Sequence, residues 1–343
     1  GEGERPLSAL LDHLAGQREL DEVPNVIYGV ELAGQRTVRA TEPQPPLKLS
    51  RLCTPDYRGM PLDSYYMPHT IFNLQSSRGC YWRKCTFCTH HFGSRFCMKS
   101  VKKTVADLRD LHQRHGARYF HFVDEAIHPG YLGKLADGIL EAGLDIDWFI
   151  YARLDPGFTP DLFAKARRAG LRMILWGFES ANQRIYNLMR KGSITHPDDK
   201  LAILQQAVDA DIWNFLFIMF GFPSETEEEA NETVDFLYDN RHLCSFGDAN
   251  FTLVKDAPIL EEPARYTITE VTERSSRGFT LTHQFRTSTG MTSEQMERML
   301  NHKELVLNRK RRYRKGFSRE RLFLYICHYG IDSIVAMKRK YHL

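Results

Sequence analysis

The sequence predicts an α/β fold, a partial (β/α)6 TIM-like barrel with a short N-terminal extension and a mostly helical C-terminal region. Three observations predict it. Between residues 66 and 255, short β-branched or aromatic runs alternate with amphipathic segments, which is the rhythm of βα units. Apolar runs such as residues 215–220 suit parallel strands that are covered on both faces. Polar residues follow the predicted strands at their C-terminal ends, where such barrels carry their active sites.

The chain divides into three predicted regions. Residues 1–65 hold a short helix, a polar and turn-rich stretch, and a proline-rich connector. This segment differs in character from the barrel that follows it. Residues 66–255 form the core barrel, and residues 256–343 form the helical C-terminal region, where the βα rhythm stops.

Each predicted strand is followed by a predicted helix. The strands are expected at residues 70–77, 118–125, 147–155, 171–180, 213–222 and 247–254. The helices between and after them are expected at residues 99–116, 129–143, 160–169, 181–192, 196–211 and 224–240. Thr159 can cap one helix, with Pro160 at its first position and Gly170 just past its end. Thr226 and Glu229 form a capping box that opens another.

Composition excludes several classes of protein. Hydrophobic residues make up 42% of the 343 residues and charged residues 26%, as in an ordinary globular protein. No apolar run approaches the roughly 20 residues that cross a bilayer, and the first residues lack the pattern of a signal peptide. The seven cysteines are an odd number with only three clustered, which is poor material for a disulfide framework. We therefore expect a cytoplasmic protein with no membrane partner.

A cysteine cluster follows the first predicted strand. In the stretch RGCYWRKCTFCTHH, Cys85 and Cys88 have the spacing that clamps one metal or cluster from a single turn, and Cys80 precedes them. Three thiolates can hold an iron–sulfur cube that leaves one iron open. His90 or His91 could instead complete a zinc site, although structural zinc sites usually use two separated ligand pairs.

The cysteine loop, with the aromatic Phe87 before its third cysteine, resembles the radical S-adenosylmethionine (SAM) superfamily. The spacing between the first two cysteines is one residue longer than the usual form, and the GCYW version resembles a known subgroup. The resemblance implies that Cys80, Cys85 and Cys88 hold a 4Fe-4S cluster whose open iron chelates SAM. It also implies reductive cleavage of SAM to a 5'-deoxyadenosyl radical, which abstracts hydrogen from an unactivated carbon.

Further motifs follow the superfamily in order. The segment HFVDEAI lies where the superfamily contacts the methionine amino group, which implicates Asp124 and Glu125. Arg153 in YARLD resembles the arginine that pairs with the methionine carboxylate, a role suited to a guanidinium fork. The resemblance assigns no catalytic residue on the protein itself.

The next two strands carry the rest of the resemblance. GFES resembles the ribose-binding segment, which implicates Glu179 and Ser180. IMFGFPSET, which contains Met219, resembles the strand segment that flanks adenine. LMRKG at residues 188–192 matches a sequence that recurs in these families.

The segment at residues 55–68, together with GCYW, HFVDEAI and GFPSET, resembles the cobalamin-binding-domain radical SAM enzymes. Many of these are methyltransferases, and their cobalamin domain commonly ends in GEGE followed by a helix. This chain begins GEGERPLSALLDHL. We expect a parent protein to bind cobalamin and to methylate a carbon of a natural product or peptide, using a reductant such as flavodoxin or ferredoxin. The resemblance implies that residues 1–65 are the end of a doubly wound cobalamin-binding domain plus a linker, and that most of that domain is absent from these residues.

Other functions remain open at this point. Radical rearrangement or cyclisation fits the same motifs, since fold does not separate these reactions. A tRNA methylthiotransferase would carry three more N-terminal cysteines, and Cys53 stands alone. A different class is a zinc-stabilised nucleic-acid-binding module that uses the basic run at residues 308–315, although a solvated helix end explains that run more simply. Iron content decides between this module and the enzyme.

Overall fold

The structure is a computed structural model that describes residues 2–32, 34–45, 47–89, 95–192, 194, 196–273, 281–307 and 318–341.

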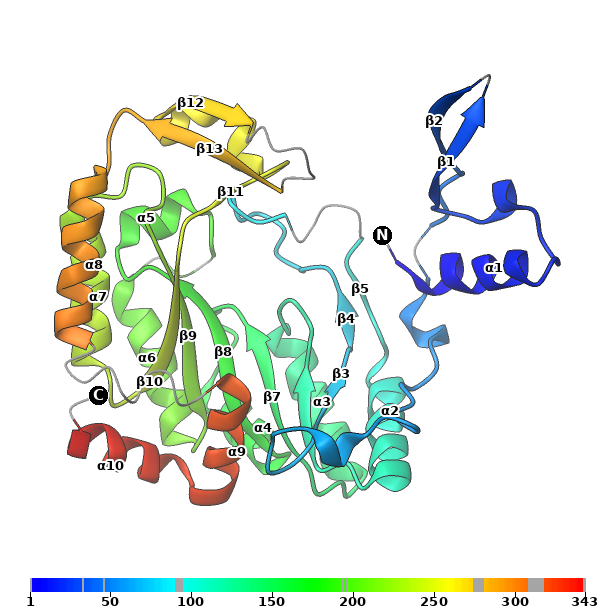
Figure 1. The fold of residues 1–343 in the computed structure, drawn as a ribbon. Coiled ribbons are helices and arrows are strands. Elements are labelled where there is room, and N and C mark those ends of the chain that lie inside the picture. Colours follow the sequence, from blue (N-terminus) through cyan, green and yellow to red (C-terminus); the bar gives the residue numbers. More distant parts are fainter. Residues whose placement is uncertain are drawn as a thin grey trace.

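A six-stranded parallel sheet forms the centre of the fold (Figure 1). Its strands are β3 (Ile71–Leu74), β6 (Tyr119–Phe122), β7 (Asp147–Ala152), β8 (Leu171–Glu179), β9 (Trp213–Phe220) and β10 (Cys244–Asn250). Neighbours in the sheet follow the order of the chain, from β3 at one edge to β10 at the other. A barrel winds in this way, whereas a doubly wound sheet reverses its order. Within the described residues the two edges do not pair, so the prediction of a partial barrel is confirmed.

Helices cover the outer face of the sheet. They are α2 (Val101–His115), α3 (Pro129–Glu141), α4 (Pro160–Arg168), α5 (Gln183–Leu188), α6 (Pro197–Asp209) and α7 (Glu227–Asp239). The predicted caps are confirmed, since the Thr159 side chain accepts a hydrogen bond from the Leu162 amide and Thr226 forms the capping box. Gly170 has φ +95°, and a Cβ there would lie 1.8 Å from the Ile146 carbonyl oxygen, so only glycine fits this turn.

Two C-terminal helices cover the inner face of the barrel at its lower end (Figure 1). They are α9 (Arg319–Tyr329) and α10 (Ile331–Tyr341). Phe323 of α9 packs on Phe149 of β7 with ring centroids 4.6 Å apart, inside a buried apolar cluster that also contains Met173 and Phe215. The helices therefore fill the N-terminal half of the barrel and leave its C-terminal half for a site.

The C-terminal region also contains strands that the sequence reading missed. Besides α8 (Ser293–Leu307), α9 and α10, it holds β12 (Ile268–Glu273) and β13 (Thr282–Thr287). β13 is the central strand of a small antiparallel sheet at the C-terminal end of the barrel, between β12 and β11 (Leu253–Val254) (Figure 1). The prediction of a mostly helical region is corrected to this extent. The short 3-10 helices at Pro258–Leu260 and Pro263–Tyr266 lead into this sheet.

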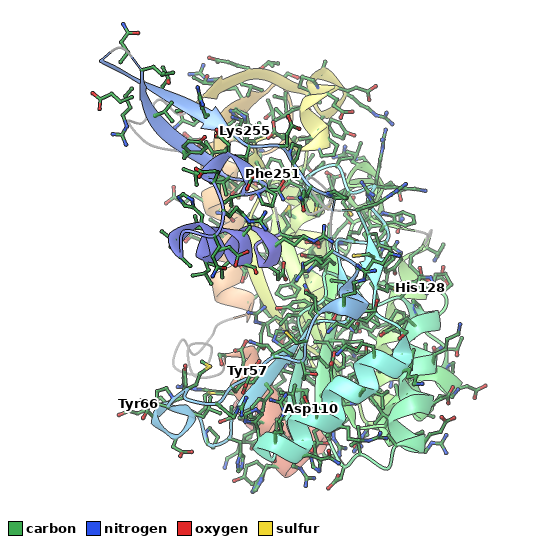
Figure 2. All side chains as sticks on the ribbon, turned by 90° about the vertical axis from the view of Figure 1, so that its right-hand side faces the viewer. Tyr57, Tyr66, Asp110, His128, Phe251 and Lys255 are labelled. Atoms are coloured by element: carbon green, nitrogen blue, oxygen red, sulfur yellow. The ribbon has the colours of Figure 1, made fainter. Side chains whose placement is uncertain are left out.

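The N-terminal segment lies beside the barrel. Helix α1 (Glu4–Leu14) is followed by the antiparallel hairpin of β1 (Ile27–Leu32) and β2 (Gln35–Ala40), which projects away from the rest of the molecule (Figure 2). Short 3-10 helices occur at Leu20–Glu22, Leu49–Arg51 and Leu62–Ser64. The chain then enters the barrel, and β4 (Ser77–Arg78) pairs with β5 (Cys97–Met98) around the cysteine cluster.

In the described part of the chain, no helix combines the length and the apolar character that crossing a bilayer requires. All seven cysteines are free thiols.

Candidate functional site

A cavity of about 490 Å³ lies at the C-terminal ends of the central strands. It is lined by Cys80, Cys85, Phe87, Cys88, His121, Val123, Asp124, Glu125, Ala126, Tyr151, Ala152, Arg153, Leu175, Gly177, Glu179, Lys191 and Phe217. All of the site residues predicted from the sequence line this cavity, except Ser180 and Met219. The fold therefore brings three cysteines together with carboxylates and two cations.

Hydrogen bonds fasten the cysteine loop to the turn after α5. The Thr86 amide donates to the Met189 carbonyl at 3.1 Å, and the Thr86 hydroxyl donates to the Leu188 carbonyl at 3.2 Å. The Trp82 indole donates to the Arg190 carbonyl at 2.7 Å. The motif LMRKG thus supplies backbone acceptors that hold the loop between the cysteines in place.

Lys191 and Glu179 form a buried ion pair in the wall of the cavity, with Nζ and Oε1 2.8 Å apart. Burial opposes the charge on Lys191, but Glu179 and Cys85 outweigh it, so the pKa of Lys191 lies above its ordinary value. Glu179 has φ +63° at the end of β8, beside a shift of register against β9. A left-handed conformation is costly for a residue with a side chain and is often kept at functional sites.

Arg153 is also buried, and its guanidinium is held from several sides. Nε and Nη2 donate to the Lys191 carbonyl at 3.3 and 2.9 Å, and Nη1 donates to Asp155 at 3.0 Å. The guanidinium lies 3.9 Å from the ring centroid of Trp82. A Cβ at Gly192 would lie 2.2 Å from Nη2, so a glycine after Lys191 leaves room for this arginine. Arg153 is therefore fixed in direction, as a binding arginine must be.

The two acidic residues after β6 lie differently. Asp124 is buried and accepts hydrogen bonds from the Ser76 amide and from the hydroxyls of Ser76 and Ser77. Burial raises the pKa of Asp124, although these hydrogen bonds act in the opposite direction. Glu125 is exposed. Asp124 thus connects β6 to the strand that leads into the cysteine loop, whereas Glu125 is an exposed residue of the same cavity lining.

Ser180 and Met219 lie outside the cavity lining. The Ser180 hydroxyl lies 3.2 Å from the Thr233 hydroxyl and accepts a hydrogen bond from the Asn182 amide. Met219 packs against the buried apolar cluster that contains Phe222. The structure gives both residues packing or capping contacts within the protein.

Comparison with known proteins matches residues 74–237 to the radical SAM superfamily. This range contains the cysteine loop and all the other predicted site residues. The chain therefore contains a radical SAM domain at these residues.

The radical SAM chain is similar to proteins with several stated activities. It is 29% identical over 242 residues to an uncharacterized methyltransferase of Pyrococcus horikoshii, covering 69% of this chain and 51% of that protein. It is 26% identical over 213 residues to an anaerobic magnesium-protoporphyrin IX monomethyl ester cyclase of Synechocystis. That match covers 60% of this chain and 42% of the cyclase. The chain thus spans about half or less of the curated relatives that it matches.

A solved structure shows the same fold. The cobalamin-dependent SAM radical enzyme OxsB, with aqua-cobalamin and SAM bound, superposes with a TM-score of 0.64 at 15% identity, over 100% of this chain and 59% of that chain. At this identity the likeness concerns the fold.

A single bound metal ion requires its ligand atoms to lie close together around it. Zinc holds its ligand atoms at about 2.0 to 2.3 Å. Within the described ranges, no three His, Cys, Asp or Glu side chains are placed to hold one ion. The cysteines of an iron–sulfur cluster bind separate iron atoms, so they stand further apart than the ligands of one ion. The donor set of Cys80, Cys85 and Cys88 suits a cluster by its chemistry, since three thiols line one cavity and thiolates are the usual ligands of iron–sulfur clusters. His90, His91 and the basic run at 308–315 lie outside the described residues.

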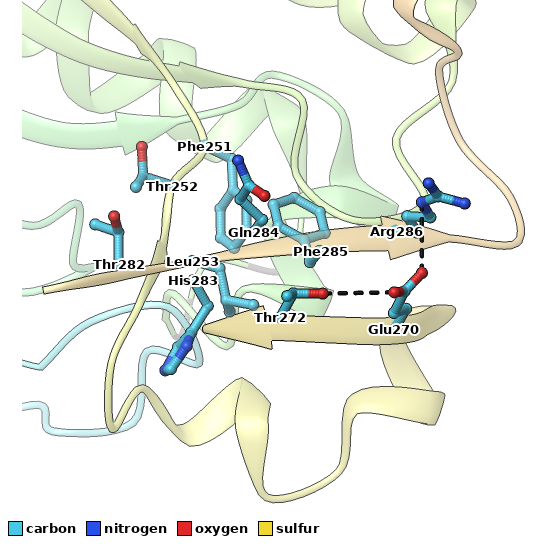
Figure 3. Close-up of a pocket in the computed structure, with 10 residues that line it drawn as sticks. All are labelled: Phe251, Thr252, Leu253, Glu270, Thr272, Thr282, His283, Gln284, Phe285 and Arg286. Carbon is cyan, nitrogen blue, oxygen red and sulfur yellow. Dashed lines mark hydrogen bonds and ion pairs between the residues drawn. The ribbon is translucent and has the colours of Figure 1, made fainter. Parts of the chain in front are cut away.

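A second cavity, of about 560 Å³, lies on the small antiparallel sheet (Figure 3). It shares no lining residue with the cavity of the cysteines. Glu270 pairs with Arg286 at 3.4 Å and accepts a hydrogen bond from the Thr272 hydroxyl. Nδ1 of His283, which also lines this cavity, has no hydrogen-bond partner in the described part of the chain. The cysteine cavity of the radical SAM domain is the one with redox-capable ligands.

Sequence reasoning missed three polar residues of the radical SAM cavity. Lys191 lies in the motif LMRKG, which the sequence analysis identified, but only the fold shows that Lys191 pairs with Glu179. His121 and Tyr151 lie inside strands, where the alternation of inward-facing residues was the available signal.

Proposed function

We propose that this chain is the catalytic part of an enzyme that cleaves SAM reductively at a 4Fe-4S cluster and methylates an unactivated carbon with the help of cobalamin. The carrying observation is that Cys80, Cys85 and Cys88 line the same cavity as Arg153 and Glu179. In this superfamily, a cluster and SAM together supply a 5'-deoxyadenosyl radical. The protein's own task is to hold both and to keep water away from the cavity.

We assign the residues around SAM as follows. Arg153 pairs with the methionine carboxylate, because its fixed guanidinium faces the cavity. Asp124 or Glu125 takes the amino group, because both carboxylates line the cavity. Glu179 takes the ribose hydroxyls. Phe87 and Met219 provide apolar contact near adenine, and Ser180 supports the ribose segment from behind.

Methylation is favoured by the Pyrococcus methyltransferase and by the cobalamin in OxsB. Ring closure is the second candidate, favoured by the similarity to the anaerobic cyclase. The substrate is a small molecule or peptide, and a one-electron reductant such as flavodoxin or ferredoxin is required. The enzyme and its reductant would both act in the cytoplasm.

Arg153→Ala is expected to weaken SAM binding by about tenfold or more, because a hydrogen bond to a charged group contributes about 1.5 to 3 kcal/mol. Calorimetric titration of anaerobically reconstituted protein with SAM measures this. Arg168→Ala, on the exposed end of α4, is the matched control and should bind like the wild type. Unchanged affinity in Arg153→Ala with a full iron complement would remove this assignment.

We also propose that residues 1–65 end a cobalamin-binding domain and link it to the barrel. Leu7, Leu11 and Leu14 of α1 form an apolar stripe and are 59%, 57% and 73% exposed. Such a stripe normally packs against another element. Arg78, two residues before Cys80, pairs with Glu2 and Glu4, which places α1 beside the cysteine loop.

The described N-terminal residues contain one helix and one hairpin and no parallel sheet. Titration of this chain with hydroxocobalamin is therefore expected to give no saturable spectral change. Stoichiometric binding would show that the 343 residues hold the cofactor by themselves and would overturn the domain proposal.

A further inference from the structure

The lower boundary of the cysteine cavity is formed by side chains from four neighbouring strands. We call His121, Tyr151, Leu175 and Phe217 the cavity floor. Alternate residues of a strand face the same side, so on β7 the inward-facing Phe149 precedes Tyr151, and on β9 Phe215 precedes Phe217. Phe149 and Phe215 are buried against α9. The cavity floor is thus the first layer of side chains above helix α9, which fills the N-terminal half of the barrel together with α10.

His121 is a buried imidazole with unused hydrogen-bonding capacity. Its ring stacks on Phe149 with centroids 4.1 Å apart and planes at 11°. Only 8% of the residue is exposed, and Nε2 has no hydrogen-bond partner in the described part of the chain. Burial lowers the pKa of His121 to about 4, so the ring is neutral at neutral pH and offers one donor and one acceptor. A buried polar atom without a partner costs stability unless a ligand satisfies it.

Tyr151 offers a second polar group on the cavity floor. Nη1 of Arg319, at the start of α9, donates to the Tyr151 hydroxyl at 2.8 Å. The phenolic oxygen is therefore the acceptor in that bond, and its own O–H remains available to donate. The Tyr151 ring stacks with Phe217, with centroids 5.9 Å apart and planes at 15°. The Arg319 guanidinium lies 5.9 and 5.7 Å from these two ring centroids and holds the stack from below.

We propose that the cavity floor is the specificity-determining subsite for the substrate and binds a planar, conjugated ring whose edge carries a hydrogen-bonding atom. Phe217 and Tyr151 supply flat aromatic surface, and His121 and Tyr151 supply the polar contacts. A layer of side chains that only had to fill the barrel would consist of aliphatic residues and would leave no ring nitrogen without a hydrogen-bond partner. The inference rests on the proposed function in placing the substrate in the same cavity as the cysteines.

The test uses indole and its carbon isostere indene as probes of the reconstituted 343-residue protein. Saturation-transfer NMR titrations give the affinity of each. The wild type is expected to bind indole saturably and to prefer it over indene by about tenfold, since indene lacks the N–H group. His121→Phe combined with Tyr151→Phe keeps both rings and should abolish that preference. Phe217→Leu should weaken both probes by about threefold to tenfold through loss of ring stacking.

Phe285→Leu, in the cavity of the small sheet, is the matched control and should change neither affinity. No saturable binding of indole, or a preference that survives the double variant, overturns the inference. S-adenosylhomocysteine binding is measured on every variant. The inference is wrong if indole displaces S-adenosylhomocysteine and Phe217→Leu weakens the binding of S-adenosylhomocysteine as much as the binding of indole. The cavity floor would then belong to the SAM site. If S-adenosylhomocysteine fails to bind the wild type, the proposed function itself fails.

Discussion

Cys85→Ala is expected to reduce the iron content of the reconstituted protein from about four atoms per chain to nearly none. Cys85 lines the cavity and belongs to the loop that Thr86 fastens to the turn after α5. Cys80 and Cys88 would be the two thiolates left to hold the cluster, one fewer than the cluster needs. Iron and sulfide assays after anaerobic reconstitution measure the effect.

The matched control for this variant is Cys97→Ala. Cys97 is also partly buried and close in sequence, but it does not line the cavity. It should retain the iron of the wild type. Full iron in Cys85→Ala, or an equal loss in Cys97→Ala, would contradict the ligand assignment.

Lys191→Met is expected to lower the free energy of unfolding by about 3 to 5 kcal/mol, because removal of one partner leaves a buried charge uncompensated. The side chains of Lys191 and Glu179 are only 12% and 10% exposed. Urea denaturation of the metal-free protein measures the loss.

A second variant identifies the charge as the cause. Adding Glu179→Gln to Lys191→Met removes the stranded carboxylate while keeping its shape, and should recover a large part of the lost stability. Arg265→Met is the exposed control, since Arg265 and Glu262 are 54% and 62% exposed, and it should cost less than about 1 kcal/mol. A loss in Lys191→Met as small as in this control would mean that the pair does not support the cavity wall.

The barrel could be predicted because its local signals agree with its global pattern. Thr159 and Thr226 cap the expected helices, and the first five apolar runs form strands in the expected order. The sixth strand, expected at residues 247–254, instead spans Cys244–Asn250, and Leu253–Val254 pairs in the small sheet. The hairpin of β1 and β2 and the sheet of β11, β12 and β13 were missed for a physical reason. All residues of β2 are exposed, so burial imposes no alternation of apolar and polar residues there. The pairing of β12 with β13 depends on contacts that a single strand does not reveal.

The site could be predicted to the level of which residues line one cavity. Residues after parallel strands meet at one end of the barrel, which brings Arg153 and Glu179 to the cysteine loop. Side-chain direction was beyond the sequence. Asp124 turns toward Ser76, and Ser180 turns toward Thr233, because hydrogen-bond partners from distant segments are available there. His121 has no motif around it, and only the fold shows that it faces the cavity.

The central claim is that the cavity holds a cluster and SAM for radical chemistry. The most direct measurement is 5'-deoxyadenosine formation from SAM and dithionite by anaerobically reconstituted protein, beside the variant with Cys80, Cys85 and Cys88 all changed to alanine. The account predicts 5'-deoxyadenosine from the wild type and none from the variant. Wild-type protein that binds zinc in place of iron and forms no 5'-deoxyadenosine would contradict it.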